Sequence, residues 1–332
     1  MDIDSRRLRR ALRKSGLSEH AINAAWPEWW SDDAEKSPSA RAELCFAVAR
    51  KLGLAPKPLY DEKVEFVWRD RARFKNGLPQ SEPERDALSS FGVSVARLLL
   101  TMVEANAPTR VTAERLRKAI LAHTPIVSFV DLISTCWALG IPVVHLRVFP
   151  LPTKSMSAMV VRCDGRFAIL LGRDSFFPAP VSFTLAHEVG HIMLGHLADE
   201  GTSIVDLEEP GVSNADEDDE ERSADAFALK LLTGREHLEI KVEGARVTSR
   251  ALAAAVIVAG PPAGIEPGTL ALCYAYQEKA WAVGMGSLKY IYPEARAVWQ
   301  DVNNIAARHF DWSRISDDNA DFIRALLERG NG

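Results

Sequence analysis

The stretch at residues 181–196, VSFTLAHEVGHIMLGH, constrains the fold of this chain more than any other part of the sequence. Its centre is an H-E-x-x-H pattern that contains His187, Glu188 and His191. On an α-helix, residues four apart lie on the same face, so the two imidazoles would point at one place. Two imidazoles suit a zinc ion, and a carboxylate beside them can take a proton from water that the metal activates. The pattern therefore predicts two zinc ligands, His187 and His191, and one catalytic acid/base, Glu188.

The flanking residues favour this helix and its burial. Apolar residues occupy most of 183–194, and Ser182 is a candidate N-cap after Pro178 and Pro180. A helix this apolar packs in the interior, where two histidines and a glutamate are costly unless they are paired or bind a metal. A chance match on an ordinary helix is the alternative, because the five-residue pattern alone is weak.

A third ligand is available in the sequence EERSADAFALKLL, which resumes a helix after an acidic stretch. A zinc ion with two histidines needs at least one more protein ligand. We predict Glu221 as that ligand, with Asp225 one turn later accepting the N–H of a ligand imidazole. Glu220 is the alternative ligand, since the start of a predicted helix is uncertain by one or two residues.

His196 does not have the spacing of a third histidine ligand. The H-E-x-x-H-x-x-G-x-x-H pattern needs its last histidine at position 197, where the chain has Leu197. We therefore predict His196 at the helix end, as a structural residue or in contact with a ligand, but not as a ligand.

A small antiparallel sheet is predicted directly before the H-E-x-x-H helix. Strand-like runs lie at 143–149, 157–162 and 166–171, and Asp164-Gly165 between the last two is typical of a hairpin turn. A small sheet followed by this helix is the order usual in zincins, an α+β fold. Residues 199–221 contain many acidic residues and no Lys or Arg, and we expect most of them to form a solvated loop.

The length of 332 residues allows two or three domains. We predict a helix–turn–helix-like helical domain at 1–58, a connector and helix at 59–105, a zincin-like metallopeptidase domain at 106–245 and a C-terminal helical domain at 246–332. Periodic apolar residues and capping signals predict helices at the following residues: 5–14, 18–25, 39–54, 81–104, 112–122, 130–139, 249–258, 269–276, 293–310 and 317–329.

The N-terminal region carries a basic helix, with Arg6, Arg9, Arg10 and Arg13 as candidate DNA-binding residues. Its segments LRRALRKSGLS and AVARKLGL resemble the Xre/Cro type of helix–turn–helix domain. The resemblance implies DNA binding through this region. A helical docking module, with the arginines on a solvated face, is the alternative.

Composition sets further bounds. The net charge of −5 excludes a general positive field that would attract nucleic acid to the whole chain. Four cysteines without a C-x-x-C pattern are typical of reduced thiols. The start lacks the apolar stretch of a signal peptide, and the longest apolar run, 251–259, is too short to cross a bilayer. We expect a cytoplasmic protein without a membrane partner.

The two motifs together, LAHEVGHIMLGH and EERSADAFALKLL, resemble the ImmA/IrrE family of metallopeptidases over roughly residues 112–232. The resemblance implies a zinc cofactor, His187, His191 and Glu221 as its ligands, and Glu188 as the catalytic acid/base. Members of the family typically cleave a cognate helix–turn–helix repressor and so switch on genes in stress responses or mobile elements. The resemblance thus implies a repressor or an antitoxin-like regulator as the protein substrate.

Two other functions fit parts of the sequence. The first is a DNA-binding regulator whose zinc site is structural or sensory, and the second is a toxin–antitoxin partner that binds without cutting. For a peptidase, an edge strand at 157–162 or 166–171 is expected to hold an extended substrate. Tyr274, Tyr276 and His196 are candidates for stabilising the oxyanion.

Overall fold

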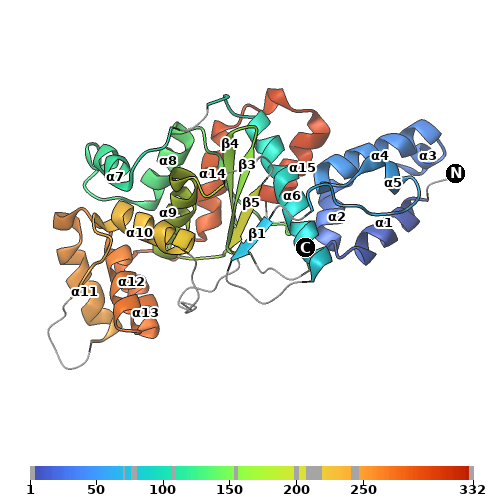
Figure 1. Ribbon diagram of the computed structural model, residues 1–332. Coiled ribbons are helices and arrows are strands. Elements are labelled where there is room, and N and C mark those ends of the chain that lie inside the picture. The colour runs from blue at the N-terminus through green and yellow to red at the C-terminus, as the bar shows by residue number, and fades with distance from the viewer. Residues whose placement is uncertain are drawn as a thin grey trace.

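The computed structural model describes residues 4–69, 72–75, 81–106, 109–152, 156–197, 202–206, 219–240 and 247–328. Within these ranges the chain forms a five-stranded sheet with helices on both faces, and a group of helices lies at each end of the molecule (Figure 1). None of the helices in these ranges combines the length and the apolar character that a membrane span requires.

The helices of the described ranges fall into three groups along the chain. The first group is α1 (Ser5–Lys14), α2 (Glu19–Ala25), α3 (Asp32–Glu35), α4 (Pro38–Leu52) and α5 (Pro56–Leu59). The second is α6 (Glu82–Thr101), α7 (Ala113–Leu121), α8 (Phe129–Ala138), α9 (Pro178–Leu194) and α10 (Asp219–Thr233). The third is α11 (Ser249–Ala259), η1 (Pro261–Ala263), α12 (Pro267–Gln277), α13 (Trp281–Ile291), α14 (Val298–His309), η2 (Trp312–Arg314) and α15 (Asp317–Leu327).

The sheet is mixed, with the strand order β1-β5-β3-β4-β2. Its strands are β1 (Ala72–Lys75), β2 (Val143–His145), β3 (Ala158–Cys163), β4 (Arg166–Leu171) and β5 (Ser203–Asp206). β3 and β4 form an antiparallel hairpin, and the backbone at Asp164 and Gly165 has the positive φ angles, 51° and 71°, that a tight hairpin turn needs. β5 is antiparallel to β3, whereas β1 is parallel to β5 and β2 is parallel to β4.

The α+β class predicted from the sequence is confirmed, but two details of the sheet were predicted wrongly. The sheet is not purely antiparallel, because β1 and β2 join it as parallel strands. Residues 203–206, which we assigned to a solvated loop, form β5 and fill the edge of β3, where Ile204 and Val205 are buried. As a result β3 and β4 are interior strands, and neither has an open edge for a substrate strand.

Alternation along the strands separates two cores. Ala158 and Val160 of β3 face a core that α7 to α10 complete, while Met159 and Val161 face a core that α6 completes. Gly92 of α6 makes the second contact close, since a Cβ there would lie 2.1 Å from the sulfur of Met159. The sheet is therefore the middle layer between α9 on one side and α6 on the other (Figure 1).

The N-terminal helices share a core with the rest of the chain. Leu8, Leu12 and Ile22 belong to the same cluster as Phe91 of α6 and Phe322 of α15. The buried Lys51 of α4 also pairs with Asp318 of α15, at 2.7 Å between Nζ and Oδ1. The shared core therefore joins residues on both sides of position 58, where we predicted the end of the N-terminal domain. The predicted domain boundaries stay a prediction.

The helices after residue 246 divide between the cores. α11, η1, α12 and α13 pack around a small core of their own, with Leu252, Ile265 and Tyr274 in it. α14 returns to the sheet, where Asn303 accepts a hydrogen bond from the N–H of His145 and donates one to its carbonyl, both at 2.8 Å. The side chain of Asn303 therefore pairs with the backbone N–H and carbonyl of His145 in the edge strand β2.

The start of α9 differs from the prediction. The helix begins at Pro178 with Phe177 as the N-cap residue, and not after Ser182. Proline fits the first helical position because its missing N–H would have no partner there. The hydroxyl of Ser182 instead donates to the carbonyl of Pro178, one turn earlier in the same helix.

Candidate metal centre

Helices α9 and α10 bring the two motifs of the sequence together. Gly190 of α9 lies against α10, and a Cβ at this residue would be 3.1 Å from the carbonyl oxygen of Ala224. Ala224 and Ala228 of α10 are buried small residues, so the two helices can pack closely. This close packing is what allows an acidic side chain near the start of α10 to reach histidines in the middle of α9.

His187, His191 and Glu221 converge on one place. The Nε2 atoms of the two histidines are 3.0 Å apart. Nε2 of His187 is 3.3 Å from Oε2 of Glu221, and Nε2 of His191 is 3.4 Å from Oε1 of the same carboxylate. Among the described residues, these three form the group of His, Cys, Asp or Glu side chains arranged to hold a metal ion.

The donor atoms fit a small tetrahedral metal ion. Ligand atoms about 2.0–2.1 Å from a tetrahedral zinc ion lie about 3.3 Å from one another. The two Nε2 atoms are 3.0 Å apart, and each lies 3.3–3.4 Å from a different oxygen of the Glu221 carboxylate, so these separations are near this spacing. Two imidazoles and one carboxylate also form a donor set that zinc accepts, whereas calcium and magnesium prefer oxygen ligands. The buried group can therefore bind a metal.

Burial gives these side chains an unusual environment. His187, Glu188, His191 and Glu221 are each at most 9% exposed, and Glu188 and His191 are fully buried. Ionisable side chains are rarely buried to this extent unless they are paired or coordinate a metal. The chance match on an ordinary amphipathic helix, which the sequence left open, does not explain this clustering.

Asp225 lies behind His187. Its Oδ1 is 2.7 Å from Nδ1 of the imidazole, on the side away from Glu221. Burial alone would lower the pKa of His187, but the hydrogen bonds to Asp225 and Glu221 and the charge of Glu188 outweigh it and raise this pKa well above 6.5. The carboxylates around this imidazole therefore favour positive charge at the centre, which a bound dication would also supply.

His196 lies behind His191 in the corresponding place. The Nδ1 atoms of the two rings are 2.8 Å apart, so His196 is in contact with a candidate ligand and is not one of the three converging side chains. Nε2 of His196 is 3.3 Å from the hydroxyl of Ser223. Ser223 is a residue that the sequence reasoning missed, although its place two residues after Glu221 in EERSADAF was a signal.

The other candidate residues lie elsewhere. Glu220, the alternative ligand, is half-exposed and is not in the converging group. Tyr274 is buried in the core of α11 to α13, and Tyr276 is 62% exposed on the same helix.

The candidate DNA-binding arginines lie on α1, at the opposite end of the molecule from α11 to α13 (Figure 1). Arg9 donates to Asn23 and stacks over Trp26, and Arg13 pairs with Glu19. Arg6 and Arg10 are exposed to solvent. Between α2 and α4 the chain forms only the four-residue helix α3, and the helix–turn–helix resemblance of this region is not confirmed.

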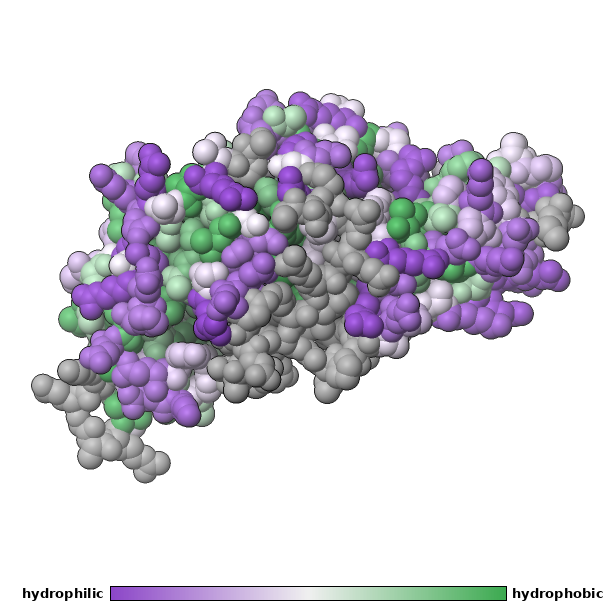
Figure 2. Space-filling model, viewed as in Figure 1, coloured by the Kyte–Doolittle hydropathy of each residue, from purple (hydrophilic) through white to green (hydrophobic). Residues whose placement is uncertain are grey.

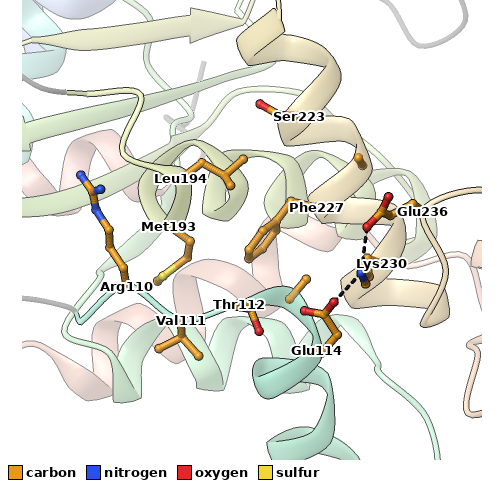
Figure 3. A pocket seen from close by; sticks show the side chains of 12 residues that line it. Arg110, Val111, Thr112, Glu114, Met193, Leu194, Ser223, Phe227, Lys230 and Glu236 are labelled. Atoms are coloured by element: carbon orange, nitrogen blue, oxygen red, sulfur yellow. Dashed lines mark hydrogen bonds and ion pairs between the residues drawn. The ribbon is translucent and has the colours of Figure 1, made fainter.

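A cavity of about 350 Å³ lies next to the centre, between the start of α7, the end of α9 and the outer face of α10. Figure 3 shows Met193, Leu194 and Phe227 on its apolar side and the ion pairs of Lys230 with Glu114 and Glu236 on its polar side. None of the three converging donor residues lines this cavity, but Ser223 does.

Comparison with known proteins connects this region to peptidases. A family model described as Peptidase U49 matches residues 150–261, which include β3, β4, α9 and α10 and therefore all three converging side chains. No curated protein and no solved structure matches the chain. Over about a third of its length, the chain is thus similar to a family of peptidases, in keeping with the peptidase resemblance of its motifs.

Proposed function

We propose that this protein is a zinc-dependent endopeptidase with His187, His191 and Glu221 as the metal ligands. The observation that carries the proposal is the convergence of these three buried side chains at 3.0–3.4 Å, on the two helices that a peptidase family model matches. Zinc is the expected metal because two imidazoles and one carboxylate leave a place open for water in its tetrahedral shell.

A zinc ion at this position would supply the Lewis acidity that activates water and polarises the scissile carbonyl. The chain itself then has to move one proton. Glu188 is fully buried and close enough to His187 for its charge to act on that imidazole. In the proposed reaction its carboxylate takes a proton from the attacking water and later delivers it to the nitrogen of the leaving amine.

Asp225 has a supporting role in this proposal. Its carboxylate lies 2.7 Å from Nδ1 of His187 and can accept a hydrogen there, which would leave Nε2 of the same ring as the atom that binds the metal. Partners of this kind fix the tautomer and the orientation of a ligand imidazole.

The substrate we propose is a regulatory protein, either a repressor or an antitoxin-like helix–turn–helix protein, whose cleavage changes gene expression. Support for this part comes from the resemblance of the two motifs to the ImmA/IrrE family. The first protein to test is the small regulator encoded beside this one, incubated with the zinc-loaded enzyme and analysed by mass spectrometry. A shift to two fragments whose masses sum to the regulator plus one water identifies cleavage, whereas a stable complex of intact proteins favours a binding partner.

Glu188→Gln is the variant that tests the proposal most directly. The amide keeps the size of the side chain but cannot accept a proton, so we expect zinc binding to persist and cleavage of the regulator or of labelled casein to disappear. Glu220→Gln is the matched control, because it removes a neighbouring acid that the converging group does not include. If Glu188→Gln cleaves at the wild-type rate, the catalytic assignment is wrong.

A second proposal concerns DNA binding through α1. Arg6, Arg10 and Lys14 are exposed and follow each other at four-residue intervals, and in the part of the chain that the structure describes they form no ion pair. Such a row of cations suits the phosphates of a nucleic acid backbone. This observation favours a regulator that touches DNA, with or without proteolysis.

The DNA proposal is tested with the full chain, because the N-terminal helices share their core with α6 and α15. We expect the variant R6E/R10E to bind duplex DNA more weakly and to lower the slope of log affinity against log salt by about 2, roughly one for each lost phosphate contact. K279E/K289E is the control, because it makes the same change of charge at two exposed lysines, one in the turn between α12 and α13 and one in α13. Equal binding by both variants would remove α1 from the proposal.

A further inference from the structure

The end of α9 returns His196 to the helix that precedes it. Gly195 has a φ of 83°, a left-handed conformation that suits glycine at a helix end. The N–H of Gly195 bonds to the carbonyl of Ile192, and the N–H of His196 bonds to the carbonyl of His191 at 3.0 Å. This pair of bonds is the Schellman arrangement. It fixes the backbone of His196 to the same residue that its side chain contacts.

The hydrogen-bond directions in this region follow from one condition. If Nε2 of His191 binds a metal, it carries no hydrogen, so the neutral ring has its hydrogen on Nδ1. That N–H faces Nδ1 of His196, 2.8 Å away, which is then the acceptor in this contact. His196 therefore carries its own hydrogen on Nε2 and donates it to the hydroxyl of Ser223 at 3.3 Å.

Ser223 completes the series. Its hydroxyl donates to the backbone carbonyl of Glu220 at 2.9 Å, in the first turn of α10. In this arrangement each N–H or O–H donates to the next member of the series, and both imidazoles are neutral. The next residue along the chain is Glu221, whose carboxylate faces Nε2 of His191 at 3.4 Å. The series thus begins at the candidate ligand His191 of α9 and ends on α10 at the residue that precedes the candidate ligand Glu221.

We propose that His196 and Ser223 are positioning residues, which hold His191 in the Nδ1–H tautomer and fix the start of α10 relative to α9. The inference rests on the proposed metal centre but not on peptide cleavage. The two candidate ligand imidazoles then have different hydrogen-bond partners. Asp225 is a charged acceptor for His187, and His196 is a neutral acceptor for His191. Three carboxylates already surround the centre, and a neutral partner adds no further negative charge there.

The test is zinc affinity, measured for the full chain by competition with a chromophoric chelator. His196→Leu removes the acceptor, and we expect affinity to fall 10- to 100-fold, as for the loss of other partners of ligand histidines. His196→Asn restores an acceptor near the position of Nδ1, so most of the affinity should return. Ser223→Ala should cause a smaller loss, because the acceptor for His191 remains. His20→Asn, at an exposed histidine of α2, is the control.

Nitrogen-15 spectra of the zinc-loaded protein provide a second readout. We expect the nitrogen chemical shifts of His196 to show hydrogen on Nε2 and none on Nδ1. Those of His191 should show hydrogen on Nδ1, the nitrogen that does not bind the metal. We call the hydrogen-bonded series of His191, His196 and Ser223 the relay. A His196 ring with hydrogen on Nδ1, or equal zinc affinity of His196→Leu and the wild type, would overturn it. An equal loss in His196→Asn and His196→Leu would do the same, since packing would then explain both.

Failure of the relay can be distinguished from failure of the proposed function. If the wild-type chain binds zinc and cleaves protein while the His196 variants keep full affinity, only the relay is wrong. If the affinities follow the expected order but Glu188→Gln still cleaves, the relay holds and the catalytic assignment falls. If the wild-type chain binds no zinc, both proposals fail.

Discussion

Two parts of this molecule gather charged residues in opposite environments. The centre between α9 and α10 places two histidines and two glutamates where solvent hardly reaches them. Helix α1 has six basic residues among ten, and most of them lie on the surface, as the hydrophilic region around the N-terminal helices in Figure 2 illustrates. A buried charge is costly and needs a specific reason, whereas an exposed charge is usual. The difference explains why the same sequence predicts a metal centre strongly and DNA binding weakly.

Among the substitutions that test this comparison, Glu221→Ala should have the largest effect, on zinc affinity. The substitution removes the one carboxylate among the three converging donors, so we expect zinc affinity to fall by more than the roughly 100-fold that loss of an outer partner causes. Chelator competition measures the change, and Glu220→Ala is the matched control on the same helix. A greater loss of zinc affinity in Glu220→Ala than in Glu221→Ala would identify Glu220 as the ligand in place of Glu221.

Asp318→Asn tests whether a buried charge outside the centre also needs its partner, here for the stability of the fold. Lys51 is 1% exposed, and its ammonium group would lose the carboxylate that lies 2.7 Å away. We expect the free energy of unfolding to drop by about 3 kcal/mol, the lower end for broken buried pairs, because a quarter of the Asp318 side chain is exposed. Urea denaturation measures it.

Lys51→Met is the companion of that variant. It removes the buried ammonium group, and the carboxylate that remains belongs to Asp318, whose side chain is 26% exposed and can be solvated. We therefore expect a stability close to that of the wild type. A loss as large as that of Asp318→Asn would show that the ion pair itself, and not the unpaired lysine, determines the stability of the α4–α15 contact.

Asp225→Asn should have a moderate effect. The amide oxygen can still accept the N–H of His187, but the negative charge is lost, so His187 would have a neutral partner as His191 does. We expect about a tenfold loss of zinc affinity, equal to about 1.4 kcal/mol. Asp219→Asn, at an exposed residue of the same helix, is the control. No loss at all would mean that the charge of the partner is unimportant.

The sequence predicted the centre because its signals are local. His187 and His191 are one helical turn apart, and Glu221 and Asp225 repeat that spacing on the next helix, so helix geometry alone brings each pair to one face. The capping box at Ser81 and Glu84 and the turn at Asp164-Gly165 are local in the same sense, and the structure has both.

The parts that sequence reasoning missed depend on contacts between distant residues. Ser203–Asp206 is a four-residue strand within an acidic stretch, and only its pairing with β3 accounts for the burial of Ile204 and Val205. β1 joins the sheet through β5 and has no other strand partner in the described chain. His196 was predicted at the helix end, as a structural residue or in contact with a ligand, but the sequence did not say which ligand it contacts, because its contact with His191 depends on the left-handed backbone at Gly195.

Glu19→Gln should have the smallest effect. Glu19 lies within reach of both Arg9 and Arg13, but all three side chains are partly or largely exposed. Exposed pairs contribute about 0.2–1 kcal/mol, and salt screens them, so we expect a loss of less than 1 kcal/mol in urea that shrinks further at high ionic strength. A loss above 2 kcal/mol would show that the charges of α1 stabilise the fold, and the comparison with the centre would then fail. A small loss would mean that the fold does not depend on the ion pairs of α1 with Glu19, so binding to an anionic partner would remain as a physical reason for so many cations on one short helix.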